Sequence, residues 1–258
     1  MHTATRRVAW ITGGGSGIGR ALALRLAHDG WSVAISGRRL EMLEETARLA
    51  GANIRVYPLD VTDVAAVRQT VTRIERETGP IQLAVLNAGL GRFLKLDELS
   101  AEVFAEHMRV NYLGTVHGID ALLPAMRARH AGHIVITASL AGYRGLPGGA
   151  AYAPTKAALI SLAESLRFAL EPEGIRISVC NPGFIKTPMT DDNHFRMPFL
   201  MDVEVAAERM YRGIRKRRFE IVFPTRLWLF AKFGRCLPFS WYFQLMRGPR
   251  RRRGSRHD

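Results

Sequence analysis

The sequence predicts an α/β fold in which helices cover both faces of a doubly wound parallel β-sheet. Short apolar runs rich in β-branched residues alternate along the chain with longer segments of helical periodicity. This alternation implies right-handed β–α–β crossovers and therefore parallel strands. The first apolar run, Val8–Ile11, has no polar alternation, which is typical of a strand buried on both faces.

The expected elements follow one another in a regular order. Apolar, β-branched runs predict strands at Val8–Ile11, Ser32–Ser36, Asn53–Tyr57, Ile81–Leu86, His133–Thr137, Arg176–Cys180 and Phe219–Phe223. Helical periodicity predicts helices at Gly17–Asp29, Leu40–Leu49, Asp63–Thr78, Glu102–Arg129, Ala151–Leu170 and Val203–Arg217. No repeat or linker divides the chain, so we expect one domain over residues 1–223 and a C-terminal extension over residues 224–258.

The net charge of +14 is unevenly distributed along the chain. From Arg212 onward, 14 Lys and Arg residues stand against Glu220 and Asp258, whereas residues 1–211 are nearly neutral. Arguments about partners from charge therefore apply only to the C-terminal segment. Nucleic-acid binding through this segment is an alternative that we disfavour, because no base-reading motif is visible.

Targeting segments, disulfides and metal sites are not expected. The chain start has no apolar core of a signal peptide, and no uncharged apolar run approaches the roughly 18–20 residues of a membrane-spanning helix. Two cysteines, Cys180 and Cys236, do not make a disulfide framework. The scattered histidines give no zinc-ligand spacing, so no metal is expected. These features favour a cytoplasmic protein.

A glycine-rich turn, Thr12-Gly13-Gly14-Gly15-Ser16-Gly17-Ile18-Gly19, joins the first strand to the first helix. Glycine permits positive φ and lets backbone N–H groups approach a pyrophosphate. The helix N-terminus adds unpaired N–H donors and a favourable dipole. Such a turn alone also fits a flexible loop, but its place between an apolar strand and an amphipathic helix predicts dinucleotide binding.

The end of the second strand bears on the choice of cofactor. NAD sites usually carry an acidic residue here, which binds the ribose 2′-hydroxyl. This sequence instead has Ser36-Gly37-Arg38-Arg39, with no carboxylate. Because an arginine fork matches a phosphate in geometry and charge, Arg38 and Arg39 predict NADP(H) rather than NAD(H). The alternative is a solvated basic turn.

Further motifs follow in a fixed order after the glycine-rich turn. They are Asp60-Val61, Asn87-Ala88-Gly89, Asn111, Ser139, Tyr152-Ala-Pro-Thr-Lys156, Pro182-Gly183, Ile185 and Thr187. Each motif is loose by itself, but the series is specific. The chain resembles the short-chain dehydrogenase/reductase family, in its single-domain form, over residues 6–223.

The resemblance implies a Rossmann fold and an oxidoreductase that moves a hydride between nicotinamide and a carbonyl or alcohol. It also implies cofactor-binding roles along the chain. Asp60 and Val61 would flank the adenine, and Asn87-Ala88-Gly89 would pass beside the riboses. The other implied cofactor contacts are Gly13, Gly15, Ser16, Gly17, Ile18, Gly19, Pro182 and Gly183, with Ile185 and Thr187 on the nicotinamide carboxamide.

Tyr152 and Lys156 are the expected proton-transfer pair. They lie four residues apart, so a helix places them on one face, one turn apart. A phenol with its ordinary pKa is a poor acid–base group at neutral pH, and we expect the neighbouring ammonium and NADP⁺ to lower that pKa. Pro154 is tolerated only if Tyr152 lies in the first turn of the helix.

Ser139 and Asn111 complete the expected catalytic set. In the family, the serine hydrogen-bonds the substrate oxygen, and the lysine also binds the nicotinamide ribose. Asn111 would bend the long helix and hold a water that links Lys156 to solvent. Without the other motifs, Ser139 would be an ordinary turn serine and Asn111 a helix-surface amide.

Two later segments bear on substrate and location. A substrate lid is expected at about residues 184–201, where Phe184, Met189, Phe195, Met197 and Phe199 suggest an adaptable apolar pocket.

Phe219–Met246 is rich in aromatics and is followed by Arg250-Arg251-Arg252-Arg253. Residues 224–253 therefore suit contact with an anionic membrane surface, although the aromatics could equally cover a sheet edge or a subunit contact. Pro238 would prevent residues 224–253 from forming one long helix.

The function predicted from the sequence is an NADP(H)-dependent oxidoreductase acting on a small-molecule carbonyl or alcohol. A dinucleotide-binding regulator without turnover is the alternative, and the intact Ser139, Tyr152 and Lys156 argue against it. By resemblance, a homodimer or homotetramer would form through the helices Glu102–Arg129 and Ala151–Leu170.

Overall fold

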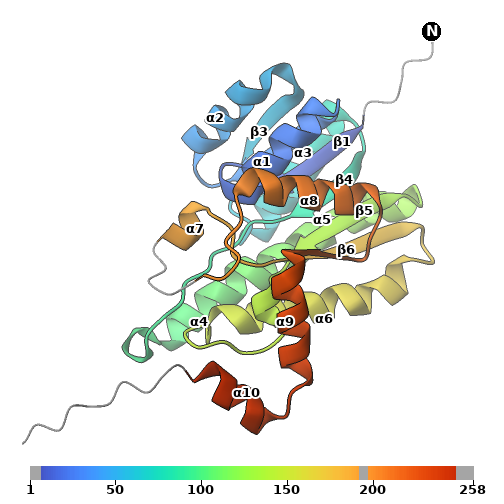
Figure 1. Cartoon of the computed structure of the whole chain (residues 1–258). Helices are drawn as coiled ribbons and strands as arrows, with labels where there is room; N and C mark the ends of the chain where they lie inside the picture. The colour runs from blue at the N-terminus through green and yellow to red at the C-terminus, as the bar shows by residue number, and fades with distance from the viewer. Residues whose placement is uncertain (1–6, 192–196, 248–258) are drawn as a thin grey trace, which may run out of the picture.

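The computed structural model describes residues 7–191 and 197–247, and its centre is a seven-stranded parallel sheet (Figure 1). The strands are β1 Val8–Thr12, β2 Ser32–Gly37, β3 Ile54–Pro58, β4 Ile81–Leu86, β5 Gly132–Thr137, β6 Ile175–Pro182 and β7 Glu220–Phe223. Their order is β3-β2-β1-β4-β5-β6-β7, and every neighbouring pair is parallel. The chain thus winds outward in both directions from the β1–β4 boundary, which confirms the doubly wound fold.

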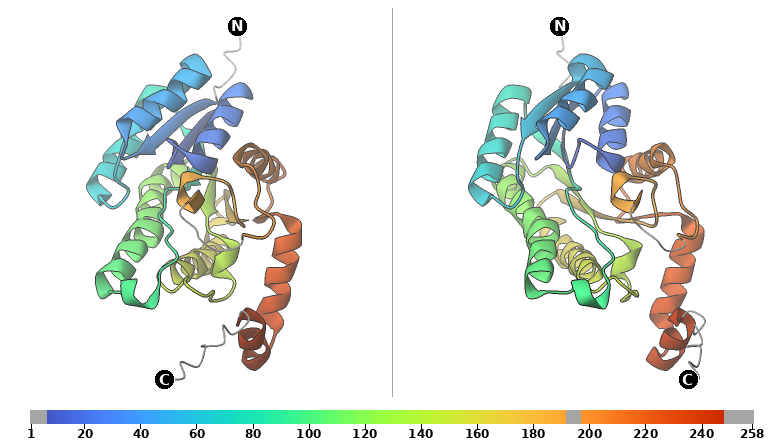
Figure 2. Two further views of the ribbon diagram at one scale, coloured as in Figure 1. Left: turned by 60° about the vertical axis from the view of Figure 1, so that its left-hand side comes forward. Right: turned by 90° about the vertical axis from the view of Figure 1, so that its left-hand side faces the viewer.

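Helices cover both faces of this sheet (Figures 1 and 2). The helices α1 Gly17–His28, α2 Leu40–Ala50 and α8 Val203–Arg215 lie on one face. The other face is covered by α3 Val64–Thr78, α5 Gly114–Ala128 and α6 Tyr152–Leu170. The short α4 Ala101–His107 and α7 Pro188–Asp191 lie near the carboxyl ends of the strands, where crossovers of this topology leave a crevice.

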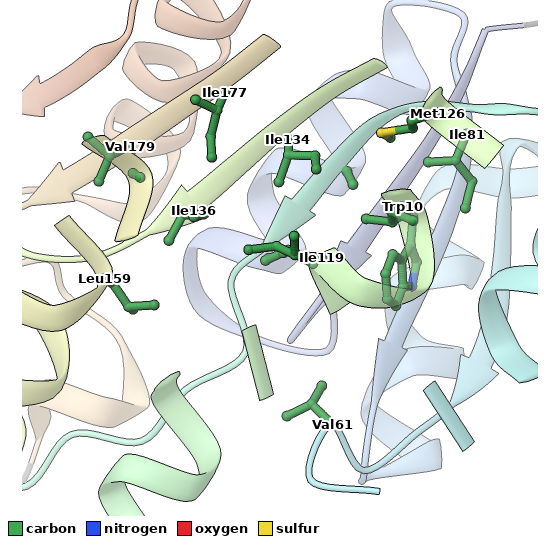
Figure 3. Packing of buried hydrophobic residues seen from close by; sticks show 14 of the residues in the cluster. Trp10, Val61, Ile81, Ile119, Met126, Ile134, Ile136, Leu159, Ile177 and Val179 are labelled. Atoms are coloured by element: carbon green, nitrogen blue, oxygen red, sulfur yellow. The ribbon is translucent and has the colours of Figure 1, made fainter. Parts of the chain in front are cut away.

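Strand β1 shows why the apolar runs form buried strands. All five of its residues are buried. Ala9 and Ile11 pack with α1 and α8, whereas Val8 and Trp10 pack with α3 and α5, since successive side chains point to opposite faces. Trp10 lies among Ile134, Ile119 and their neighbours (Figure 3), and its indole N–H donates to Ser36 Oγ at 3.0 Å. Truncating such a side chain costs about 3–5 kcal/mol.

The long helix expected at Glu102–Arg129 is not continuous. It consists of α4, a π-helical segment η3 at Met108–Leu113, and α5. The side chain of Asn111, in the middle of η3, is fully buried and bonds to the loop after β4. A π turn of this kind is rare in helices and is found frequently at functional sites.

Other boundaries differ by one or two residues. The helix expected to reach Arg217 ends at Arg215, and Arg217 has a φ of 53°, which ends the helical conformation. Beyond β7, the extension forms α9 Thr225–Cys236 and α10 Phe239–Met246, divided at Pro238 as expected. Both helices project from the β7 edge (Figures 1 and 2). Over the described ranges, no helix is both long and apolar enough to cross a membrane.

Candidate active site

A cavity of about 690 Å³ opens at the carboxyl ends of β1, β4, β5 and β6. Many of the residues singled out from the sequence line it, although they come from distant parts of the chain. They are Gly13, Ser16, Gly17, Ile18, Asn87, Ala88, Gly89, Ser139, Tyr152, Lys156, Pro182, Gly183, Ile185 and Thr187. The predicted residues outside its lining are Gly15, Gly19, Arg38, Arg39, Asp60, Val61 and Asn111.

The glycine-rich turn forms a tight cradle at one end of the cavity. Gly13 has a φ of 71°, a conformation that favours glycine. Its N–H donates to Ser36 O at 2.7 Å, which holds the turn against β2. A Cβ added to Gly19 would lie 2.2 Å from Gly13 O, so no larger residue fits between the turn and α1. The turn and helix must therefore stay close together.

The N-terminus of α1 is suited to an anion. The helix starts at Gly17, and its N-cap residue Ser16 makes no side-chain capping bond. Both residues line the cavity. The first backbone N–H groups of α1, with the helix dipole behind them, can therefore bind phosphate oxygens. A dinucleotide pyrophosphate fits this cradle, and the residues that would hold it are those of the turn itself.

Arg38 and Arg39 lie beyond the cavity, directly after β2, and both are exposed. Asp60 is near Arg38. Its burial acts to raise the pKa of Asp60, but bonds from the Thr62 N–H and hydroxyl, with the charges of Arg38 and Arg109, hold that pKa below its usual value. Asp60 is therefore ionised at neutral pH and lies near the positive charges of Arg38 and Arg109.

Val61 and Thr187 are placed by packing. Val61 is buried, and a Cβ added to Gly114 would come within 2.6 Å of its Cγ2, so its side chain belongs to the core (Figure 3). Only the Val61 backbone is left to face a ligand. Thr187 lies beside the glycine-rich turn, because a Cβ on Gly17 would be 3.2 Å from Thr187 Cγ2. The loop after β6 thus meets the start of α1.

Tyr152 begins α6 and Lys156 follows one turn later, which gives Pro154 a place in the first turn. The Lys156 ammonium donates to Thr137 O, at the end of β5, at 3.0 Å. Its Nζ is 5.6 Å from the centroid of the Tyr152 ring. The two side chains therefore share one face of α6 and point to the end of β5.

The pKa values of this pair differ from the expectation. Burial raises the pKa of Tyr152 to about 12, although a hydrogen bond with Ser139 opposes it. Burial also lowers the pKa of Lys156 to about 8. The lowering expected from the ammonium and NADP⁺ together is not seen in the protein alone, because desolvation outweighs the effect of the Ser139 hydroxyl. At neutral pH the phenol is protonated and the lysine is still largely charged.

Ser139 follows β5 and connects two parts of the site. Its hydroxyl donates to Pro182 O at 3.3 Å and accepts from the Ala141 N–H at 3.1 Å. The same hydroxyl is near enough to Tyr152 to lower the pKa of its phenol. Ser139 and Tyr152 therefore lie close together, and both line the cavity.

Asn111 lies behind this pair and does not line the cavity. Its side-chain N–H groups donate to Leu90 O at 2.9 Å and Thr155 Oγ1 at 3.0 Å, and its Oδ1 accepts from the Leu90 N–H at 2.8 Å. A Cβ on Gly89 would lie 3.0 Å from Asn111 Oδ1 and 3.6 Å from Lys156 Nζ. Asn111 thus joins the loop after β4 to α6; the water that it was expected to hold stays a prediction.

The cavity has a second wall that the sequence did not indicate. The expected lid contributes Phe184 and Met189, whereas Phe195 lies outside the described residues. The C-terminal aromatics were expected to cover a sheet edge, a subunit contact or a bilayer. Part of the extension instead lines the cavity, through Leu227, Phe230, Ala231, Gly234, Tyr242, Leu245 and Met246. Only the aromatic richness of Phe219–Met246 could have signalled this wall.

The fold and this site together define a nucleotide-dependent oxidoreductase of the Rossmann type. Residues 7–196 match the family described as short chain dehydrogenase, so the chain belongs to the short-chain dehydrogenase/reductase family, as its motifs predicted. An uncharacterized oxidoreductase of Myxococcus xanthus is 39% identical over 241 residues, covering 92% of this chain and 95% of that protein. One from Staphylococcus epidermidis is 31% identical and covers 76% of this chain and 85% of that protein.

Solved structures give the same assignment. A short-chain dehydrogenase/reductase from Burkholderia phymatum in complex with NAD is 28% identical, with a TM-score of 0.82 over 96% of this chain and 98% of that one. An alcohol dehydrogenase from Thermococcus sibiricus complexed with 5-hydroxy-NADP is 29% identical, with a TM-score of 0.75 over 84% of this chain and 96% of that one. These neighbours support a nicotinamide dinucleotide as the cofactor of this oxidoreductase.

Proposed function

We propose that the protein is an NADP(H)-dependent carbonyl reductase or alcohol dehydrogenase, with Tyr152 as its acid–base group. One observation carries the proposal. The hydroxyl groups of Ser139 and Tyr152 and the Lys156 ammonium meet at one end of a cavity whose other end is the glycine cradle. This is the arrangement that hydride transfer to a carbonyl requires.

Each residue has a separate task in the reduction. The bound nicotinamide supplies the hydride that the carbonyl carbon accepts. The Ser139 hydroxyl turns from Pro182 O to donate a hydrogen bond to the carbonyl oxygen, and it stabilises the charge that develops there. The Tyr152 hydroxyl, protonated because its pKa is about 12, transfers its proton to that oxygen. The Lys156 ammonium stabilises the phenolate that remains, and alcohol oxidation reverses these steps.

The preference for NADP(H) rests on Arg38 and Arg39. Both side chains are exposed at the end of β2 and free to meet a ribose 2′-phosphate, and no carboxylate follows Ser36 to bind a 2′-hydroxyl instead. The relatives do not settle this preference, because the solved neighbours include complexes with NAD and with an NADP derivative.

The test is oxidation of NADPH, followed by its absorbance, with a panel of aldehydes, ketones and 3-oxoacyl compounds. NADH and the variant Tyr152→Phe are the controls. We expect turnover with NADPH that is largely lost in the variant. Tight NADPH binding with no turnover across the panel would contradict the proposal and favour the dinucleotide-binding regulator.

We also propose that copies of the chain associate through α4, α5 and α6, as its family resemblance implies. Exposed apolar side chains support this, since Phe168 of α6 is 82% exposed and Phe104 of α4 and Met108 and Leu113 of η3 are exposed as well. Light scattering should give the mass of a dimer or tetramer, and Phe168→Glu should lower it. A monomeric wild type would contradict this association.

A peripheral contact with an anionic membrane surface is a second proposal about partners. Phe239, Trp241 and Phe243 of α10 are 71%, 64% and 54% exposed, and residues 224–258 carry nine Lys and Arg residues against one acidic residue, Asp258. Exposed aromatics beside basic groups suit a bilayer interface. Flotation with phosphatidylserine vesicles tests it, and full-length protein that stays at the bottom of the gradient would refute it.

A further inference from the structure

The active-site cavity extends to the C-terminal helices α9 and α10. Helix α9 lies directly against the end of β6, since a Cβ on Gly183 would be 2.6 Å from Leu227 Cδ2. Gly183 adjoins Pro182, whose carbonyl accepts the Ser139 hydroxyl bond. Further along the two helices, Phe230 and Leu245 also line the cavity. The wall that they form therefore begins beside a catalytic residue.

Arg144 holds this wall in place. Its guanidinium donates to the carbonyls of Gly234 and Leu237 at the end of α9, the latter at 2.7 Å. The same group lies over the rings of Phe239 and Tyr242 of α10, 4.8 and 4.1 Å from their centroids. A planar cation with several donors can satisfy the free carbonyls of one helix and stack on the rings of the next.

Neighbouring residues of the same loop strengthen the attachment. Tyr242 of α10 donates its hydroxyl hydrogen bond to Gly145 O at 2.6 Å. Tyr143 donates to Glu220, and Glu220 also pairs with Lys232 of α9 at 3.5 Å. The loop 140–151 that makes these contacts is the connection between Ser139 and Tyr152. Both helices are therefore fixed to the segment that carries the catalytic hydroxyls.

The chemistry of the wall indicates what it accepts. Among the described residues that line the cavity, none is acidic. Its basic residues besides Lys156 are Lys95, in the loop after β4, and Arg144, which is engaged by α9 and α10. The lining that these two helices supply is Leu227, Phe230, Ala231, Gly234, Tyr242, Leu245 and Met246. A wall of this kind binds an apolar body by removing it from water, with no built-in partner for a charge.

We propose that α9 and α10 form the specificity wall of the active site, held by Arg144, and that the substrate is a carbonyl or alcohol carried on a long apolar body. This inference rests on the proposed function, because it assigns the substrate class of the same site. Arg144 is a positioning residue in this arrangement, and Phe230 and Leu245 contact the apolar body.

The test compares NADPH-dependent reduction of butanal, octanal and dodecanal by the full-length enzyme. Burial of about 0.8 kcal/mol per methylene should raise kcat/KM about fourfold for each methylene that reaches the wall, so dodecanal should exceed butanal by about tenfold or more. Equal kcat/KM values for the three aldehydes, or a higher value for butanal, would overturn the substrate class and leave the proposed function standing.

Matched variants on α9 distinguish a loss of contact with the wall from a general loss of activity. Phe230→Asp places a charge in the wall and should lower kcat/KM for dodecanal about tenfold or more while changing butanal less than about twofold. Phe233→Asp is the control, because Phe233 lies on the same helix, is 62% exposed and does not line the cavity. Equal losses in both variants would overturn the role of Phe230.

Arg144→Ala tests the attachment of the wall. It should raise KM for dodecanal by a larger factor than it lowers kcat for butanal, and Arg144→Lys should recover only part of the loss, because an ammonium cannot replace the planar fork. If kcat for butanal fell equally, Arg144 would position the catalytic hydroxyls instead, and its role in the wall would be overturned. Unchanged NADPH affinity confirms that each variant is folded.

A binding measurement keeps the inference testable should no aldehyde react. Calorimetric titration with n-dodecanol should show binding that Phe230→Asp abolishes and Phe233→Asp retains, while n-butanol should bind far more weakly. Absence of dodecanol binding to the wild type would overturn the inference. Dodecanol binding without any aldehyde turnover would instead count against the proposed function alone.

Discussion

The Lys156 ammonium nitrogen lies 5.6 Å from the centroid of the Tyr152 ring, one helical turn further along α6. That nitrogen is held by Thr137 O at 3.0 Å, at the end of the neighbouring strand β5. The lysine charge is thus fixed by the sheet rather than by the phenol. It can therefore stabilise a phenolate without forming a bond that would compete with the substrate for the Tyr152 hydroxyl.

Replacing Tyr152 by phenylalanine should remove proton transfer and leave cofactor binding intact. We expect turnover to fall by about 10²–10⁴-fold, as is typical of general acid–base groups, with NADPH affinity nearly unchanged. Steady-state kinetics and NADPH fluorescence titration measure the two quantities. Tyr57→Phe is the control, because the lost hydroxyl bonds Glu77 and Tyr57 does not line the cavity. Turnover like that of the wild type would remove Tyr152 from the mechanism.

Carbonyl reduction should weaken as the pH rises through about 8. Burial lowers the pKa of Lys156 to about 8, so the ammonium is present below that pH and is lost above it. Without the charge, the phenolate that Tyr152 leaves is less stable and proton donation slows. A profile of kcat/KM against pH should therefore fall on its basic side. A profile that stays level well beyond pH 8 would contradict this role of Lys156.

Exchanging the basic turn after β2 should invert the cofactor preference. In Arg38→Asp with Arg39→Ala, the 2′-phosphate loses its positive partners and meets a carboxylate, which instead suits the 2′-hydroxyl of NADH. Each lost charged hydrogen bond is worth about 1.5–3 kcal/mol, so NADPH affinity should fall about tenfold or more. Titrations with both cofactors measure this change, with exposed Arg48→Ala on α2 as the control. Unchanged NADPH affinity would show that the assignment is wrong.

The strands and most helices could be predicted because local patterns determine them. Val8–Thr12 is buried on both faces in the structure, as its unbroken apolar run indicated. The family resemblance implied a bend at Asn111, but no local pattern predicts its π turn, since the turn accompanies bonds to Leu90 and Thr155, which are distant in the sequence. The position of α9 depends in the same way on Arg144, which no local pattern connects to the carbonyl of Gly234.

The residues of the candidate site could likewise be predicted, whereas their pKa values could not. Which residues meet at the cavity followed from motif order and parallel topology, because the carboxyl ends of parallel strands share one edge. Their energetics did not follow from the sequence. The pKa of Tyr152 depends on how completely the surrounding chain excludes water, and this desolvation raised a value that the neighbouring charge was expected to lower.

His133 offers a test of stability far from the active site. Its Nε2 lies 2.8 Å from Ser178 Oγ, and that hydroxyl donates to Arg218 O at 2.7 Å. The Ser178 proton is thus already used, so the imidazole must donate from Nε2. Burial, followed by the charges of Arg176 and Arg217, lowers the pKa of His133 to about 4.

A lowered histidine pKa makes the protein sensitive to acid. The unfolded chain binds the proton at pH values below about 6.5, whereas the folded protein resists it until about pH 4. The contribution is present above pH 6.5 and is lost as the pH falls towards 4, by up to about 3 kcal/mol. Urea unfolding at a series of pH values should show His133→Gln losing less stability over this interval than the wild type. The control His28→Gln, at an exposed position, should follow the wild type. Equal acid sensitivity in wild type and His133→Gln would mean that other groups control unfolding in acid.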